Sequence, residues 1–146
     1  LFERYPLFDA IQFPANIFDH RFLAENIGGF ILDRGIMAFC RSVYLQGLFL
    51  LPPESLGPQA SHACGELLRL HEFAKVRGWK VDSLAFAFVN SFSHNNSLVI
   101  GMETAEQIYR NAENLKRSLP EEIRGELLLK FSAVADTIRD PRRWGS

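Results

Sequence analysis

The sequence predicts an α/β protein built on a parallel β-sheet. Short apolar runs of strand length alternate with longer segments of helical periodicity along the 146 residues. These apolar runs are continuous rather than alternating, as is typical of parallel strands that are covered on both faces. Signals for helix starts and stops follow each run, so each strand is followed by one or two helices. This order favours a parallel sheet with right-handed crossovers.

The first predicted unit is a strand at 10–13 followed by a helix. Pro14 lacks a backbone N–H and stops the strand. Asp19 is placed to cap the helix, whose apolar residues recur at helical spacing up to Arg34. Gly35 ends it, because a helix end often needs a left-handed backbone.

The second predicted unit is a strand at 36–40 followed by two helices. A loop rich in Pro and Gly leads from the strand to a helix at about 62–77, which Gly78 closes. A further helix covers about 82–92 and carries many apolar side chains.

The third predicted unit is a strand at 98–100 followed by two helices. Thr104 with Gln107 three residues later is a capping box, which starts the first of them. The last helix starts near Ser118, with Pro120 at an early helical position, and its apolar face continues to Ala135.

Composition excludes several classes of function. The 16 basic and 17 acidic residues give a net charge of -1 and form no block, so no general attraction to nucleic acid or an acidic membrane is expected. No apolar run approaches the roughly 20 residues that span a bilayer, and no secretory signal peptide is recognised. Cys40 and Cys64 have no metal-ligand spacing, and we interpret them as reduced thiols of a cytoplasmic protein.

Three parallel strands make a difficult free-standing sheet because both edges lack partners. A (β/α)8 TIM barrel holds such strands but takes about 250 residues. We therefore interpret residues 1–146 as one partial barrel domain, completed by chain outside this sequence or by a partner.

In a barrel, function resides at the carboxyl ends of the strands. The candidates there are Gln12 and Asn16, the segment 41–47 and the segment 101–107. Gly101 lets a ligand approach the backbone, and the helix behind it presents free N–H groups, so this turn suits an anion. A plain, well-capped turn remains an alternative, as does a purely structural role for Gln12. No histidine is assigned to catalysis and no metal site is expected.

Four segments together resemble the aldo-keto reductase family, in the family's order and with similar gaps. They are 11–16, 41–48, 98–107 with Asn111, and the terminal 141–144. The resemblance implies that the chain is the C-terminal portion of a TIM barrel, with about three βα units and C-terminal helices. It also implies an oxidoreductase that transfers a hydride between NAD(P)H and an aldehyde or ketone.

The resemblance further implies a role for each candidate residue. Gln12 would bind the nicotinamide carboxamide, and Arg41 stands where many members place an aromatic residue against the nicotinamide ring. Three residues would line the pyrophosphate: Ser42, Tyr44 and Gly47. Six would surround the adenosine end: Gly101, Met102, Glu103, Gln107, Arg110 and Asn111.

The identity of the cofactor stays open between NADP and NAD. Members that prefer NADP commonly have basic residues around the 2′-phosphate, but Met102 and Gln107 occupy those places here. Glu103 adds a negative charge nearby, and a carboxylate beside a phosphate is unfavourable. Arg110 offers partial compensation, so the sequence favours NADP only weakly.

The family's catalytic Asp, Tyr, Lys and His come from earlier strands, and no segment here matches them. This chain alone is therefore not expected to reduce a carbonyl. One alternative is a non-catalytic barrel module that binds a nucleotide or a protein. Another is an inactive fragment that self-associates through its open sheet edges. The substrate and the oligomeric state are not predicted.

Overall fold

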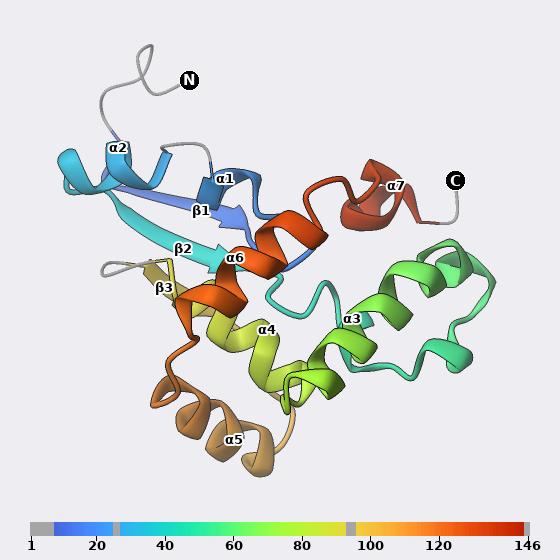
Figure 1. The fold of residues 1–146 in the computed structure, drawn as a ribbon. Coiled ribbons are helices and arrows are strands. Elements are labelled where there is room, and N and C mark those ends of the chain that lie inside the picture. Colours follow the sequence, from blue (N-terminus) through green and yellow to red (C-terminus); the bar gives the residue numbers. More distant parts are fainter. Residues whose placement is uncertain (1–7, 25–26, 93–95, 145–146) are drawn as a thin grey trace.

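The computed structural model describes residues 8–24, 27–92 and 96–144, and within them it shows a three-stranded parallel sheet. The strands are β1 (Ala10–Pro14), β2 (Met37–Arg41) and β3 (Asn96–Val99), in the order β1-β2-β3. Arg41 is in register with Pro14 on one side and Val99 on the other. The carboxyl ends of all three strands therefore lie level with one another, as Figure 1 shows.

Helices follow each strand, as predicted. They are α1 (Arg21–Ala24), α2 (Ile27–Asp33), α3 (Cys64–Val76), α4 (Val81–Asn90), α5 (Ala105–Leu115), α6 (Glu121–Lys130) and α7 (Asp136–Arg139). Short 3-10 turns occupy Leu48–Leu50, Pro53–Ser55, Pro58–Ala63 and Pro141–Arg143. None of the described helices combines the length and apolar character that a membrane span requires.

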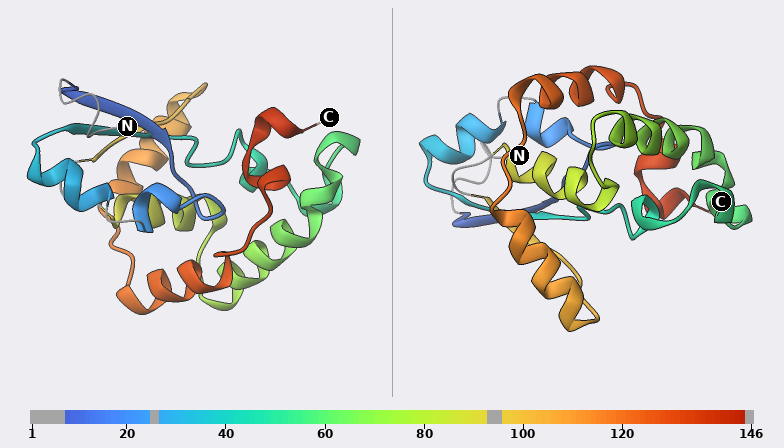
Figure 2. Two further views of the ribbon diagram at one scale, coloured as in Figure 1. Left: turned by 90° about the horizontal axis from the view of Figure 1, so that it is seen from above. Right: turned by 60° about the horizontal axis from the view of Figure 1, so that its bottom comes forward.

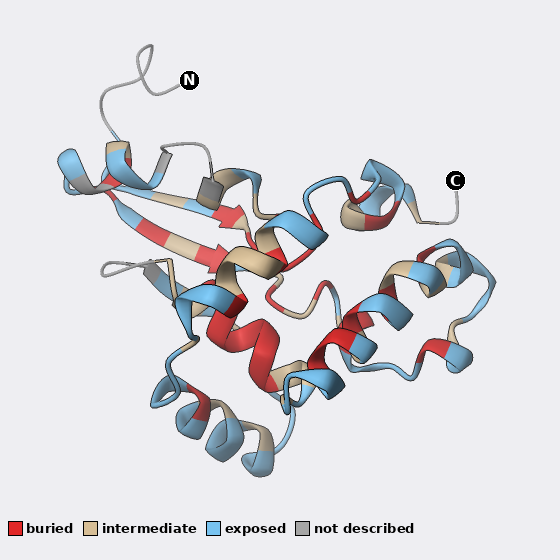
Figure 3. Ribbon diagram, viewed as in Figure 1, coloured by how far each residue is buried: buried red, intermediate tan, exposed pale blue. Residues whose placement is uncertain are grey.

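The helices cover one face of the sheet. In the left panel of Figure 2, α1, α2, α4 and α6 all lie on the same side of β1 and β2. On that side Phe13, Ala38 and Cys40 are buried, and α4 is buried along almost its whole length (Figure 3). The other face exposes Met37 and Val99, so the expectation of strands covered on both faces is wrong for the described chain.

Three aromatic rings hold the C-terminal segment to the centre of the fold. Phe18 packs edge-on against Phe49, with ring centroids 4.8 Å apart, and lies 5.3 Å from the ring of Phe131. All three side chains are almost completely buried. Because such rings bury large apolar areas, this cluster links the end of α6 to the loops that follow β1 and β2.

The predicted helix between Asp19 and Gly35 is two helices, α1 and α2, separated at residues 25–26 outside the described chain. The carboxylate of Asp19 does not cap it, because it accepts two hydrogen bonds from the Arg21 guanidinium at 2.8 and 3.0 Å. Gly35 ends α2 as predicted: its φ is +63°, and the Ile36 amide donates to the Ile31 carbonyl at 3.0 Å.

The predicted last helix is also two helices, since α6 ends at Lys130 and α7 begins at Asp136. Phe131 leaves the helical conformation, with φ -113° and ψ 19°, and its ring is buried. Pro120 is the residue before the first turn of α6 rather than part of it, because its ψ of 139° is extended. The proline ring fixes φ alone, and φ near -57° suits both conformations.

Candidate functional site

A cleft of about 720 Å³ lies at the carboxyl ends of the three strands, and we call it the strand-end cleft. It gathers residues that follow β1, β2 and β3. The predicted site residues that line it are Gln12, Arg41, Ser42, Tyr44, Gly47, Gly101, Met102, Glu103 and Gln107. Gln46 and Leu50 also line the cleft. Gln46 lies in the predicted segment 41–47 but was given no role of its own, and Leu50 follows the segment 41–48 and stands in no motif.

Two predicted residues lie outside this cleft. Arg110 lines a neighbouring groove and makes ion pairs with Glu106 at 2.7 Å and with Asp82 at 3.5 Å. Asn111 lines a groove beside α5, where its carboxamide oxygen accepts a hydrogen bond from the Tyr44 hydroxyl at 2.9 Å. Arg110 is therefore engaged with carboxylates, and Asn111 supports a wall of the cleft from behind.

The 42–47 loop after β2 has an unusual backbone. Ser42, Leu45, Gln46 and Gly47 have φ values of 61°, 47°, 55° and 83°, all in the left-handed region. A non-glycine residue in this region costs of order 1–3 kcal/mol and persists only where its surroundings hold it. Such strain clusters at binding and catalytic sites, which makes this loop a candidate for ligand binding.

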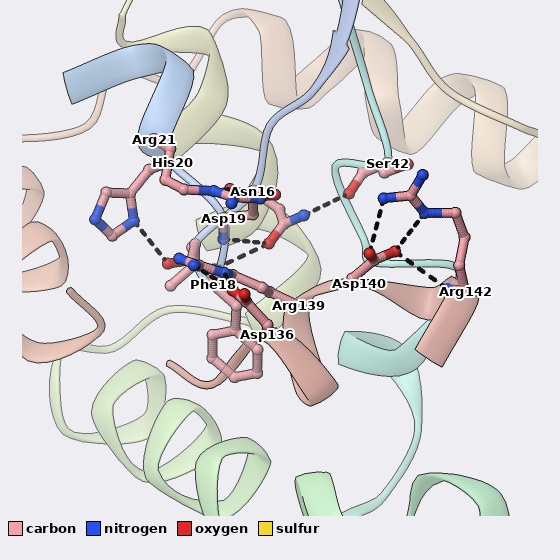
Figure 4. A network of polar contacts seen from close by, with 11 residues as sticks. Asn16, Phe18, Asp19, His20, Arg21, Ser42, Asp136, Arg139, Asp140 and Arg142 are labelled. Carbon is pink, nitrogen blue, oxygen red and sulfur yellow. Dashed lines mark hydrogen bonds and ion pairs between the residues drawn. The ribbon is translucent and has the colours of Figure 1, made fainter. Parts of the chain in front are cut away.

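Hydrogen bonds from the loop after β1 hold the 42–47 loop in place. The Ala15 amide donates to the Arg41 carbonyl at 3.0 Å. The side-chain amide of Asn16 donates to the Ser42 carbonyl at 3.2 Å, as Figure 4 shows. Asn16 is completely buried, and its Oδ1 accepts from the amides of Phe18 and Asp19, both at 2.9 Å. Asn16 is thus a positioning residue rather than a contact for a ligand.

The capping box at the start of α5 forms as predicted. Thr104 Oγ1 accepts from the Gln107 amide at 3.2 Å, and Gln107 Oε1 accepts from the amides of Glu103 at 2.6 Å and Thr104 at 3.3 Å. The amides of Ala105 and Glu106 have no partner among the described residues. These two backbone N–H groups at the N-terminus of α5 can donate hydrogen bonds to an anion.

Solved structures of aldo-keto reductases align with most of this chain. One from Bacillus halodurans covers 95% of it at 20% identity, with a TM-score of 0.69 in the holo form and 0.64 in the apo form. A thermostable aldo-keto reductase in complex with the inhibitor epalrestat covers 81% at 19% identity, with a TM-score of 0.57. This chain shares its fold with aldo-keto reductases.

The chain spans less than half the length of these aldo-keto reductases, between 38% and 49%. No protein-family model matches the sequence, and the search of curated proteins found no match. The likeness therefore shows the fold, an α/β architecture of the barrel kind.

Burial sets the protonation of the two groups closest to the 42–47 loop. It raises the pKa of the Tyr44 hydroxyl to about 12, an effect that Asp82 reinforces and Arg110 opposes. Burial also raises the pKa of the Cys40 thiol to about 11. Tyr44 is therefore a neutral hydrogen-bond donor at neutral pH, and Cys40 is not a nucleophile. Cys40 and Cys64 are both free thiols, as predicted.

A second cleft, of about 590 Å³, lies on the other side of the 42–47 loop. We call it the tail cleft, because the C-terminal residues 139–142 form one wall and the residues after β1 form another. Arg41, Ser42 and Gln46 line both clefts. The two clefts therefore adjoin at the end of β2 and at the 42–47 loop.

Proposed function

We propose that this chain is the C-terminal, cofactor-binding part of an aldo-keto reductase-like oxidoreductase, which transfers a hydride between NAD(P)H and an aldehyde or ketone. The observation that carries the proposal is the strand-end cleft, because it joins three separate segments that resemble family motifs. The fold shared with aldo-keto reductases supports it independently. Ligands of barrel proteins bind at this end of the strands.

The residues of the strand-end cleft fit a nicotinamide dinucleotide. A side chain at Gly101 would meet no atom within 4 Å, so the backbone there is open to a ligand. The unpartnered amides of Ala105 and Glu106 suit a phosphate. The exposed amide of Gln12 offers both a donor and an acceptor to a carboxamide. When bound, the cofactor supplies the hydride, and these residues orient it.

The charges near α5 favour NAD over the NADP that the sequence weakly favoured. Arg110 is the basic residue expected to compensate for Glu103, but its guanidinium is paired with Glu106 and Asp82. Glu103 is exposed and lines the cleft. A 2′-phosphate placed here would meet an uncompensated carboxylate, which lowers its affinity.

The rest of the barrel would complete the enzyme. Within the described chain, β1 and β3 each have one unpaired edge, and one face of the sheet exposes Met37 and Val99. We propose that residues 1–146 form one partial barrel domain of a cytoplasmic enzyme. The other part of the barrel would cover this face and bring the catalytic Asp, Tyr, Lys and His.

Cofactor titrations test the proposal. NADH fluorescence is followed on addition of the chain, and NADPH is compared. We expect Glu103→Gln to improve NADPH binding relative to NADH by about fivefold, or ~1 kcal/mol, as for an exposed charge pair. The matched control is Glu113→Gln, an exposed carboxylate on α5 that pairs with Lys116 and does not line the cleft. The proposal fails if a protein that contains the whole barrel neither binds a nicotinamide cofactor nor reduces carbonyls.

A second candidate is a non-catalytic module that binds a nucleotide or a protein. The exposed apolar side chains of Ile108 and Leu115 on α5 favour it, since such residues often mark a contact surface. In the right panel of Figure 2, α5 projects from the edge of the fold, with α4 as its neighbouring helix. Carbonyl reduction by the whole-barrel protein separates the two candidates, because a binding module would retain the cofactor without turnover.

A further inference from the structure

Arginines dominate the charged lining of the tail cleft. Four of them line it: Arg21, Arg41, Arg139 and Arg142. The guanidinium is planar, remains charged at every physiological pH and matches the two oxygens of a carboxylate or phosphate. Whether such a cleft can take an anion depends on how many of its arginines are already satisfied by carboxylates of the protein.

Three of these arginines are paired with aspartates, as Figure 4 shows. Arg21 donates two hydrogen bonds to Asp19, at 2.8 and 3.0 Å. Arg142 donates two to Asp140, both at 2.8 Å, and these bonds lower the pKa of Asp140 to about 2. The third, Arg139, donates to Asp136 at 2.6 Å. Each pair leaves little positive charge for a ligand.

Arg41 is different, because it faces no carboxylate among the described residues. Its side chain is exposed, and among the described residues its guanidinium donates a single hydrogen bond, to the hydroxyl of Ser42 at 3.2 Å. Arg41 is therefore the arginine of this lining whose charge no aspartate among the described residues balances. Most of the hydrogen-bonding capacity of its guanidinium is therefore available to a ligand.

The position of Arg41 relates this charge to the proposed reaction. Arg41 is the last residue of β2 and is in register with Pro14 of β1 and Val99 of β3. It lines both the tail cleft and the strand-end cleft. A group in the tail cleft would therefore lie directly across the 42–47 loop from a cofactor in the strand-end cleft. A substrate that meets the cofactor in the strand-end cleft would have room for its far end in the tail cleft.

We infer that the tail cleft binds a carboxylate or phosphate group through Arg41. This rests on the proposed function for one point, namely that the group belongs to the carbonyl substrate. The parent enzyme would then act on aldehydes or ketones that carry an acidic group, and Arg41 would be a specificity-determining residue. The same anion chemistry could also come from the cofactor's own phosphates, which the experiment has to separate.

Calorimetric titration with succinate and with inorganic phosphate, without cofactor, tests the anion site. We expect saturable binding to the unmodified protein, and about tenfold or more weaker binding to Arg41→Gln. Binding to Arg41→Lys should be weakened less, because lysine keeps the positive charge but cannot donate to both oxygens of a carboxylate in the way a planar guanidinium does. The control is Lys116→Gln, which removes one exposed positive charge far from the cleft and should leave binding unchanged. Arg41→Gln should fold normally, since the side chain is exposed and has no ion-pair partner in the described part of the chain; an unchanged thermal melt verifies this.

Two results would overturn the anion site: equal binding by Arg41→Gln and the unmodified protein, or an equal loss in Lys116→Gln. A second titration at saturating NADH identifies the source of the anion. Succinate binding that persists supports a substrate group, and succinate binding that NADH abolishes shows that succinate stands in for a cofactor phosphate. If NADH does not bind at all to a protein with the whole barrel, the proposed function fails, while the loss in Arg41→Gln still decides the anion site by itself.

Discussion

The hydroxyl of Tyr44 donates a hydrogen bond to the carboxamide oxygen of Asn111 at 2.9 Å, across 67 positions of the chain. It joins the 42–47 loop to α5, and both elements contribute residues to the lining of the strand-end cleft. The two elements come from distant parts of the sequence, so this hydrogen bond links two sides of the site directly.

Replacing Tyr44 by phenylalanine should destabilise the protein by about 1 kcal/mol, the usual worth of a partly buried hydrogen bond. Urea denaturation measures this change in the free energy of unfolding. Tyr109→Phe is the matched control, because Tyr109 is 74% exposed and should change stability by less than about 0.5 kcal/mol. Equal effects of the two substitutions would show that the contact with Asn111 contributes nothing.

Stability should fall in alkaline solution. The pKa of the Cys40 thiol rises from 9.0 to about 11 on folding, and that of the Tyr44 hydroxyl rises from 10.0 to about 12. The folded protein therefore binds more protons than the unfolded chain between about pH 9 and pH 12, and this stability is lost as pH rises through that window. The free energy of unfolding measured against pH should decline there, and less steeply in Cys40→Ala. A flat profile would contradict the burial of both groups.

A side chain at Gly47 should destabilise the protein. Its φ of 83° lies in the left-handed region, where a Cβ costs roughly 1–2 kcal/mol, so Gly47→Ala should lower the free energy of unfolding by about that amount. Gly57 has a φ of -66° and open space around it, so Gly57→Ala should be neutral or slightly stabilising. Thermal or urea denaturation of both variants gives the comparison, and a neutral Gly47→Ala would exclude the described loop conformation.

The cap of α5 should contribute measurably to stability. Thr104→Ala removes the acceptor for the Gln107 amide and should cost ~1 kcal/mol, whereas Thr104→Ser keeps the oxygen and should cost little. Amide hydrogen exchange within α5 reports the effect locally, with faster exchange expected only in the alanine variant. Similar exchange in both variants would mean that the capping box does not hold the first turn.

The sequence was a good guide to the strands and to local signals. The apolar runs located β1, β2 and β3 to within about two residues, since apolar runs of this length bounded by turn signals are typical of strands. The helix end at Gly35 and the capping box of Thr104 were also predicted. A left-handed backbone favours glycine, and a helix N–H without a partner in the helix favours a side-chain oxygen just before the first turn.

Features set by tertiary contacts were not predictable in this way. The apolar spacing from Leu127 to Ala135 predicted one helix, but the burial of Phe131 against Phe18 ends it. The left-handed φ of Leu45 and Gln46 goes against the preference of both residues and depends on the contacts of the loop after β1. The pairing of Arg110 with Asp82, 28 positions away, likewise leaves no trace in the local sequence.

Hydrogen exchange with and without NADH tests the central claim most directly, because it shows whether distant segments form one cofactor site. The account predicts that NADH slows exchange together in the 42–47 loop and in residues 101–107. The α3 helix, which contributes no residue to the strand-end cleft, should be unchanged and serves as an internal control. Protection confined to one of the two segments, or located elsewhere in the fold, would contradict the claim.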